Sequence, residues 1–140
     1  VAEDLSALGH VLLLRGRARE AGTTFKEALR LTAEHYGSDS PEAGIARLDL
    51  ALTLPAAERV PAAETGWRTV LASTGETSAD RGVAMSLYGE VLATGGRRAD
   101  GLRWMRQGAA LLERVVGPND DLTAEAARRV ARFELPRANV

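Results

Sequence analysis

The sequence lacks cysteine and has little of several other residue types. None of its 140 residues is cysteine, which excludes disulfides, thiol chemistry and zinc–cysteine sites. Aromatic residues make up only 4%, and lysine occurs once, at Lys26, among eighteen basic residues. The formal net charge is −1 with acidic and basic residues interspersed, which gives no support to nucleic-acid or anionic-membrane binding. No apolar run approaches the roughly 20 residues of a membrane helix.

The motifs of common enzyme active sites are also missing. The sequence contains neither a P-loop nor Gly-x-Gly-x-x-Gly, His-Glu-x-x-His or Gly-x-Ser-x-Gly. His10 and His35 have no third candidate metal ligand at a suitable spacing. Asp39, Asp120 and Asp121 fall in expected loops, where aspartate normally serves as a turn or cap residue. The sequence therefore predicts no enzyme activity, no metal and no cofactor.

The sequence does contain internal repetition. In each copy a large residue stands beside a small one, and later a small residue precedes a bulky one by a helical turn. The copies begin at Leu8, Leu50 and Tyr88, and their second parts are 21–25, 63–67 and 101–105. Such repetition predicts a stack of helical units, with Phe25, Trp67 and Met105 buried at equivalent places.

Hydrophobic spacing predicts seven helices. Their expected ranges are 3–15, 18–35, 41–54, 61–73, 78–94, 98–116 and 122–134. Ser40 should cap the third helix, which Pro55 should end about a turn early. We expect Pro61 to open the fourth helix, and Thr77 and Asp80 to form a capping box for the fifth.

The repeated pattern resembles the tetratricopeptide repeat family, with Leu12 in the place of the family's tyrosine. The usual repeat of that family is about 34 residues long. The offsets here, 42 and then 38, imply longer connections between units. Segments 35–41 and 115–121 look like the Gly-x-Asp-x-Pro loops of the longer variant found in kinesin light chains and large bacterial regulators.

The resemblance implies an all-α, right-handed solenoid of antiparallel helix pairs. Its single domain, 1–140, would comprise units at about 2–39, 40–76 and 77–119 and a terminal helix at 122–134. It would be a piece of a longer protein.

In this family the first helices of the units line a concave groove that binds extended or helical peptides. Carried over residue by residue, the groove positions here are Ser6, His10, Leu13, Leu48, Asp49, Leu52, Ser86, Glu90, Ala93, Arg128, Arg129 and Arg132. Acidic residues upstream and arginines downstream favour a peptide that is basic at one end and acidic at the other. The alternative is that these are solvated helix faces, with the three arginines facing a missing partner helix.

The resemblance implies a cytoplasmic protein- or peptide-binding module. The arginine bias suggests a bacterial source, where such arrays often form the sensor arm of a signal-transduction ATPase or a transcription activator. A second hypothesis is an architectural module that self-associates or packs against another domain of its own chain. A third is an adaptor or enzyme regulator that makes contact through its convex face, including Trp104. The partner's identity, the oligomeric state and the role of the last helix stay open.

Overall fold

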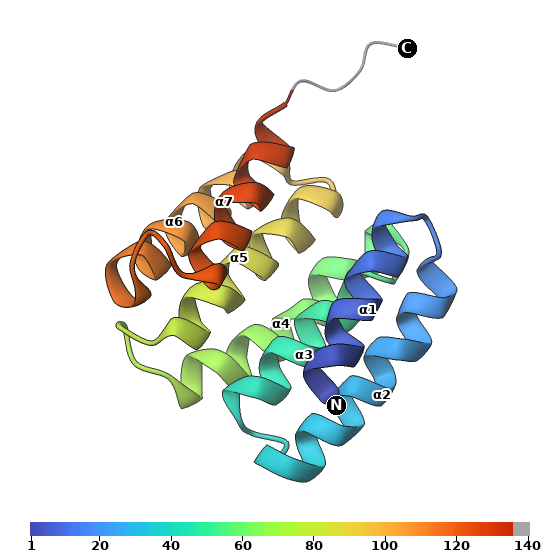
Figure 1. The fold of residues 1–140 in the computed structure, drawn as a ribbon. Helices are drawn as coiled ribbons and strands as arrows, with labels where there is room; N and C mark the ends of the chain where they lie inside the picture. The colour runs from blue at the N-terminus through green and yellow to red at the C-terminus, as the bar shows by residue number, and fades with distance from the viewer. Residues whose placement is uncertain (136–140) are drawn as a thin grey trace, which may run out of the picture.

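The computed structural model describes residues 1–135, which form seven α-helices and no strand. The helices are α1 (Ala2–Leu14), α2 (Ala18–Tyr36), α3 (Pro41–Ala51), α4 (Ala56–Ser73), α5 (Ala79–Thr94), α6 (Arg98–Val116) and α7 (Asp121–Glu134). Helix pairs follow one another from the N-terminal α1–α2 hairpin to α5–α6, with α7 packed beside α5 and α6 (Figure 1). The all-helical repeat solenoid predicted from the sequence is confirmed.

The helices form two layers. In each unit the first helix packs against the second, and α2, α4 and α6 each pack against the first helix of the next unit. The larger apolar cluster spans α3, α4 and α5 and includes Leu48, Val70 and Val91. A smaller cluster around Phe25 joins α1 and α2. The core is therefore spread along the array, and each unit depends on its neighbours.

Four glycines adopt a backbone conformation that other residues rarely take. Gly16 and Gly96 have φ of 75° and 100° in the equivalent turns inside the first and third hairpins. Gly37 and Gly117 have φ of 100° and 93° at another equivalent pair of positions, where α2 and α6 end. Glycine has no Cβ and so accepts positive φ at little cost. These positions fix the same chain reversals in two copies of the unit.

Of the two helix caps predicted from the sequence, the cap of α3 is present and the capping box of α5 is not. Ser40 Oγ accepts a hydrogen bond from the Ala43 amide at 3.1 Å, so the predicted cap of α3 is confirmed. Asp120 plays the same part for α7 by accepting from the Leu122 amide at 2.9 Å. The capping box predicted for α5 is wrong. Ser78 is the N-cap there and makes no side-chain cap bond.

The second hairpin differs from the prediction on both sides of its turn. Helix α3 ends at Ala51 rather than Leu54, because Thr53 and Leu54 make tight turn bonds to Leu50 and Ala51 instead of helical ones. Pro55 is then the N-cap of α4. Pro61, predicted to open α4, lies inside it, where a proline lacks the amide for a helical bond.

The position of this turn also corrects the predicted register of α4. The second helices begin at residues 18, 56 and 98, so their offsets are 38 and then 42, the reverse of the order found for the first helices. Ala63, which is fully buried, therefore occupies the place of Phe25 and Met105. Trp67, expected there, is one helical turn further on and only half-buried. The sequence alignment missed a deletion of about one helical turn inside the hairpin.

Candidate functional site

The predicted groove positions lie between successive first helices, at three equivalent levels that we call seams. Each seam contains two positions on consecutive turns of one helix and one position on the next helix. The first seam consists of Ser6, His10 and Asp49, the middle seam of Leu48, Leu52 and Leu87, and the third seam of Ser86, Glu90 and Arg129.

The first seam joins α1 to α3 through a buried carboxylate. Ser6 Oγ donates a hydrogen bond to Asp49 Oδ2 at 2.9 Å, and His10 Nε2 lies 2.8 Å from Asp49 Oδ1. The Asp49 side chain is only 5% exposed. The His10 ring also meets the Phe25 ring edge-on, with centroids 5.2 Å apart. Asp49 is therefore satisfied on both oxygens although it lies inside the array.

The protonation of His10 depends on this contact. Burial by itself would lower the pKa of the imidazole, because it disfavours the charged form. The hydrogen bond to Asp49 and the negative charge of its carboxylate outweigh burial and raise the pKa above the ordinary value of 6.5. The first seam is thus an ion pair when His10 is protonated.

The middle seam is entirely apolar. Leu48, Leu52 and Leu87 are 0%, 3% and 3% exposed and belong to the larger core cluster. They join α3 to α5 by burying hydrocarbon, with no polar partner to satisfy.

The third seam joins α5 to α7 through an ion pair in which the acidic residue is on the first of the two helices and the basic residue is on the second. Arg129 Nε donates to Glu90 Oε1 and an Arg129 terminal nitrogen donates to Ser86 Oγ, both at 2.8 Å. Arg132 donates to the same Glu90 oxygen at 2.5 Å. The Arg129 and Glu90 side chains are 8% and 11% exposed. The acidic partner here belongs to the earlier helix, whereas in the first seam it belongs to the later one.

The structure brings together most of the predicted groove residues, but inside helix contacts. Those that are buried are Leu48, Asp49, Leu52, Ser86, Glu90, Ala93 and Arg129. Ser6, His10 and Leu13 are half-buried, and Arg128 and Arg132 are exposed. The expected charge polarisation is reduced, because Asp49 pairs with His10 while Glu90 pairs with Arg129 and Arg132.

A groove of about 380 Å³ runs across the first-helix layer. It is lined from α1, α3, α5 and α7, and it includes the predicted Ser6, His10, Asp49, Ser86 and Arg129. The remaining lining residues, which sequence reasoning did not select, are Glu3, Ala7, Ile45, Val83, Leu87, Leu112, Leu122, Glu125 and Ala126. Most of these residues that belong to α1, α3, α5 or α7 lie one helical turn from a predicted position. Helical spacing could therefore have found them.

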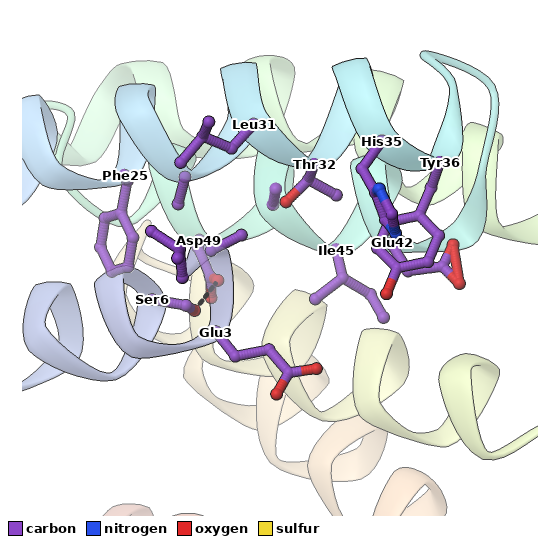
Figure 2. Close-up of a pocket in the computed structure, with 14 residues that line it drawn as sticks. Glu3, Ser6, Phe25, Leu31, Thr32, His35, Tyr36, Glu42, Ile45 and Asp49 are labelled. Atoms are coloured by element: carbon purple, nitrogen blue, oxygen red, sulfur yellow. Dashed lines mark hydrogen bonds between the residues drawn. The ribbon is translucent and has the colours of Figure 1, made fainter.

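A second cavity, of about 590 Å³, lies between α1, α2 and α3. Phe25, Leu31 and Ile45 supply apolar walls, and Asp49 lies beside Ser6 at one end (Figure 2). Sequence reasoning missed this cavity. The available signal was Thr32, a small polar residue where the third unit has Leu112.

An aromatic cluster of Trp67 on α4, Tyr88 on α5 and Trp104 on α6 joins the two helix layers. The Trp67 and Tyr88 rings are stacked at 5.7 Å, and the Trp104 ring stands edge-on to both at 4.9 and 5.0 Å. Burial raises the pKa of Tyr88. The adaptor hypothesis places Trp104 in a partner contact on the convex face. In the structure Trp104 packs in this cluster and so connects α6 with α4 and α5.

Residues 1–135 contain neither a candidate metal site nor a helix that could span a membrane. No group of three His, Asp or Glu side chains is placed to hold a metal ion in this range. None of the helices described has the length and apolarity needed to cross a bilayer.

Comparison with known proteins adds a family match. A model described as a tetratricopeptide repeat matches residues 5–42, which cover most of α1, all of α2 and the loop into α3. The same hairpin and loop recur in the third unit, at α5, α6 and the loop into α7. The match covers 38 of the 140 residues and supports a tetratricopeptide repeat of the kinesin-light-chain-like type. No curated protein matches the chain. Tetratricopeptide repeats are typically protein-interaction modules.

Proposed function

We propose that this chain binds an extended or helical segment of a partner protein in the groove across α1, α3, α5 and α7. The observation that carries this proposal is that the groove is lined by all four helices of the first-helix layer. Apolar side chains such as Val83 and Leu122 lie in it beside acidic Glu3 and Glu125. A long surface of this kind can contact successive residues of one peptide, with apolar pockets for affinity and charges for orientation.

The larger context of this binding is part of the same proposal. The segment bound comes from a separate protein or from another domain of the same chain, and the array serves as the sensor or interaction arm of a bacterial regulatory protein. The arginine-rich composition and the long loops support this reading. The partner is recognised by shape and by acidic residues in the groove, and no nucleic acid or membrane is involved.

Blocking the groove tests the proposal. A random peptide library is selected on the intact protein, and the captured peptides are measured on Ala7→Arg and Ala110→Arg. Ala7 is exposed within the groove, whereas Ala110 is exposed on α6 and does not line it. We expect Ala7→Arg to weaken binding about tenfold or more and Ala110→Arg to leave it unchanged. Equal binding by both variants would place the contact elsewhere.

Self-association is the second candidate, and the outer face of α1 favours it. Leu8 and Val11 are 49% and 44% exposed. Their equivalents on α5, Tyr88 and Val91, are packed into the core region that α5 shares with α4. An apolar face at the array's end can receive a helix of another copy. Sedimentation of the parent and Leu8→Glu would test this, since a parent that is already monomeric at high concentration contradicts it.

A further inference from the structure

The cavity between α1, α2 and α3 lies where the first unit has smaller side chains than the third unit. Thr32 stands where the third unit has Leu112, which is 1% exposed and packs closely against Gly82. Asp49 stands where the third unit has Arg129, whose side chain extends to Ser86. These two smaller residues at equivalent positions contribute to the open space of about 590 Å³ in the first unit.

The cavity's chemistry combines apolar walls with negative charge. Phe25, Ala28 and Ile45 contribute hydrocarbon, while the mostly buried Asp49 lies at one end. Glu3 of α1 and Glu42 of α3 also line the cavity, and Figure 2 shows Glu42 beside Tyr36 at the end away from Asp49. Among the described residues that line it, none is lysine or arginine. His35 and Tyr36 lie at the far end, away from Asp49 (Figure 2).

In the third unit, a basic side chain occupies the position that corresponds to the acidic end of the cavity. There a guanidinium occupies the position equivalent to Asp49 and donates to Ser86 and Glu90. In the first unit Ser6 and His10 occupy the places of Ser86 and Glu90, and the carboxylate comes from the later helix instead. Ser6 and His10 each occupy one hydrogen-bond acceptor site of the Asp49 carboxylate. An ionised carboxylate has about four such sites in total. Acceptor capacity therefore remains for a further donor.

We propose that this cavity binds a basic group carried on an apolar stem, namely the side chain of an arginine or lysine in the bound peptide. The guanidinium or ammonium pairs with Asp49 and is drawn in by Glu3 and Glu42, while the stem packs on Phe25 and Ile45. The peptide source rests on the proposed function, because the cavity and the groove share Glu3, Ser6, Ile45 and Asp49. A peptide lying in the groove can thus place one side chain in the cavity.

A small probe tests the cavity independently of any peptide. Phenylguanidinium carries the charged group on a ring, and phenylurea is its neutral near-isostere. In ¹H–¹⁵N NMR spectra of the intact protein we expect phenylguanidinium to shift the amides of Ala28, Thr32, Ala46 and Asp49. Phenylurea should bind about tenfold more weakly, because it lacks the charge-assisted bond to the carboxylate. Equal affinity of the two probes would overturn the proposal.

Two substitutions separate filling the cavity from removing its charge. Thr32→Leu copies the third unit and places a larger side chain in the cavity lining, so it should weaken phenylguanidinium binding about tenfold, whereas Thr32→Val, which exchanges the hydroxyl for a methyl group, should retain binding within about twofold. Asp49→Asn should lower phenylguanidinium affinity about tenfold and leave phenylurea unchanged. Unchanged phenylguanidinium binding by Thr32→Leu contradicts the site even if Asp49→Asn fails to fold.

The peptide library separates this inference from the groove itself. Peptides enriched in arginine or lysine beside apolar residues, and weakened by both Ala7→Arg and Thr32→Leu, support both proposals. Peptides weakened by Ala7→Arg but bound fully by Thr32→Leu keep the groove and overturn the cavity's role. If phenylguanidinium binds as expected while no peptide is captured, the basic-group site stands and the peptide source fails together with the proposed function.

Discussion

The first and third seams occupy equivalent positions in the array, yet they join their helices with opposite charge arrangements. In the first seam a histidine on α1 meets an aspartate on α3, and in the third a glutamate on α5 meets an arginine on α7. Serine stands at the same place in both and donates to the carboxylate of Asp49 in one but accepts from Arg129 in the other. A hydroxyl can do either, so the same backbone geometry serves both arrangements.

The middle seam shows what the repeat geometry requires. Leu48, Leu52 and Leu87 fill the same three positions with hydrocarbon alone. Charge is therefore not needed to hold successive first helices together. The polar seams hold α1 and α7, the outer members of the first-helix layer, and they make the position of each outer helix depend on one specific pair.

The largest effect should come from breaking the third seam. Arg129→Met leaves Glu90 nearly buried with only Arg132 as a partner, and we expect the unfolding free energy to fall by about 3 kcal/mol. Converting the seam to that of the middle interface, with Ser86→Leu, Glu90→Leu and Arg129→Leu together, should restore most of this loss. Urea denaturation measures both. A triple variant no more stable than Arg129→Met would show that the seams are not interchangeable.

The next effect concerns how closely the hairpins pack in the first and third units. A Cβ at Gly101 would press against the Gly89 carbonyl oxygen and lie 2.5 Å from the Ala93 nitrogen, and backbone cannot yield easily. The equivalent Ala21 already carries a Cβ while fully buried. Gly101→Ala should therefore cost about 2 kcal/mol by overpacking.

The matched change in the first unit is Ala21→Gly, which should cost about 1 kcal/mol through helix propensity and lost contact. Thermal and urea unfolding of the two variants give the comparison. If Gly101→Ala is as stable as the parent, α5 and α6 are not held closer than α1 and α2.

A smaller effect on stability should follow from replacing the charged residues of the first seam with those of the third. His10→Glu places a second carboxylate beside Asp49, and at about pH 8 we expect a loss of about 1 kcal/mol from like-charge repulsion in a partly buried place. Adding Asp49→Arg recreates the third seam's serine, glutamate and arginine and should recover stability. A double variant that is less stable than His10→Glu would mean that the first seam cannot hold an arginine.

The sequence predicted the helices of the first and third units closely and the second unit poorly. Repetition between the first and third units placed α2 and α6 within a residue or two, because their glycine turns and apolar spacing are nearly identical. In the second unit, Pro61 favoured a late helix start, but α4 begins at Ala56. In this part of the helix Val60 packs against the larger core cluster, and Arg59 donates to the carbonyl oxygens of Leu54 and Thr94. Tertiary contact there overrides the local proline signal.

For the candidate site, the family resemblance placed Asp49, Glu90 and Arg129 on the first helices, and the structure has them on α3, α5 and α7. Whether the groove binds a partner stays a prediction. The resemblance could not show that Asp49 meets His10 or that Glu90 meets Arg129, because those contacts depend on how one unit is rotated against the next. The cavity was hidden for a related reason. It results from what Thr32 fails to fill, and that becomes visible only when equivalent residues are compared in space.

The smallest effect should be a pH dependence confined to the first seam. The pKa of His10 is raised in the folded protein, so protonated His10 stabilises the folded state most fully below its unfolded value of 6.5. That stabilisation is lost as pH rises through the folded pKa. We therefore expect the unfolding free energy to fall between about pH 6 and about pH 8, and His10→Gln should remove this part of the slope. Burial raises the pKa of Tyr88 from 10.0, which lies above this window, and burial also raises the pKa of Asp80 from 3.8. Both groups are present in the parent and in His10→Gln, so the difference between the two slopes reports His10 alone. Urea denaturation at the two pH values gives the measurement, with His35→Gln as the control, because His35 is exposed and lies outside the seams. If His10→Gln keeps the parent's full pH slope, the His10–Asp49 pair does not stabilise the contact of α1 with α3.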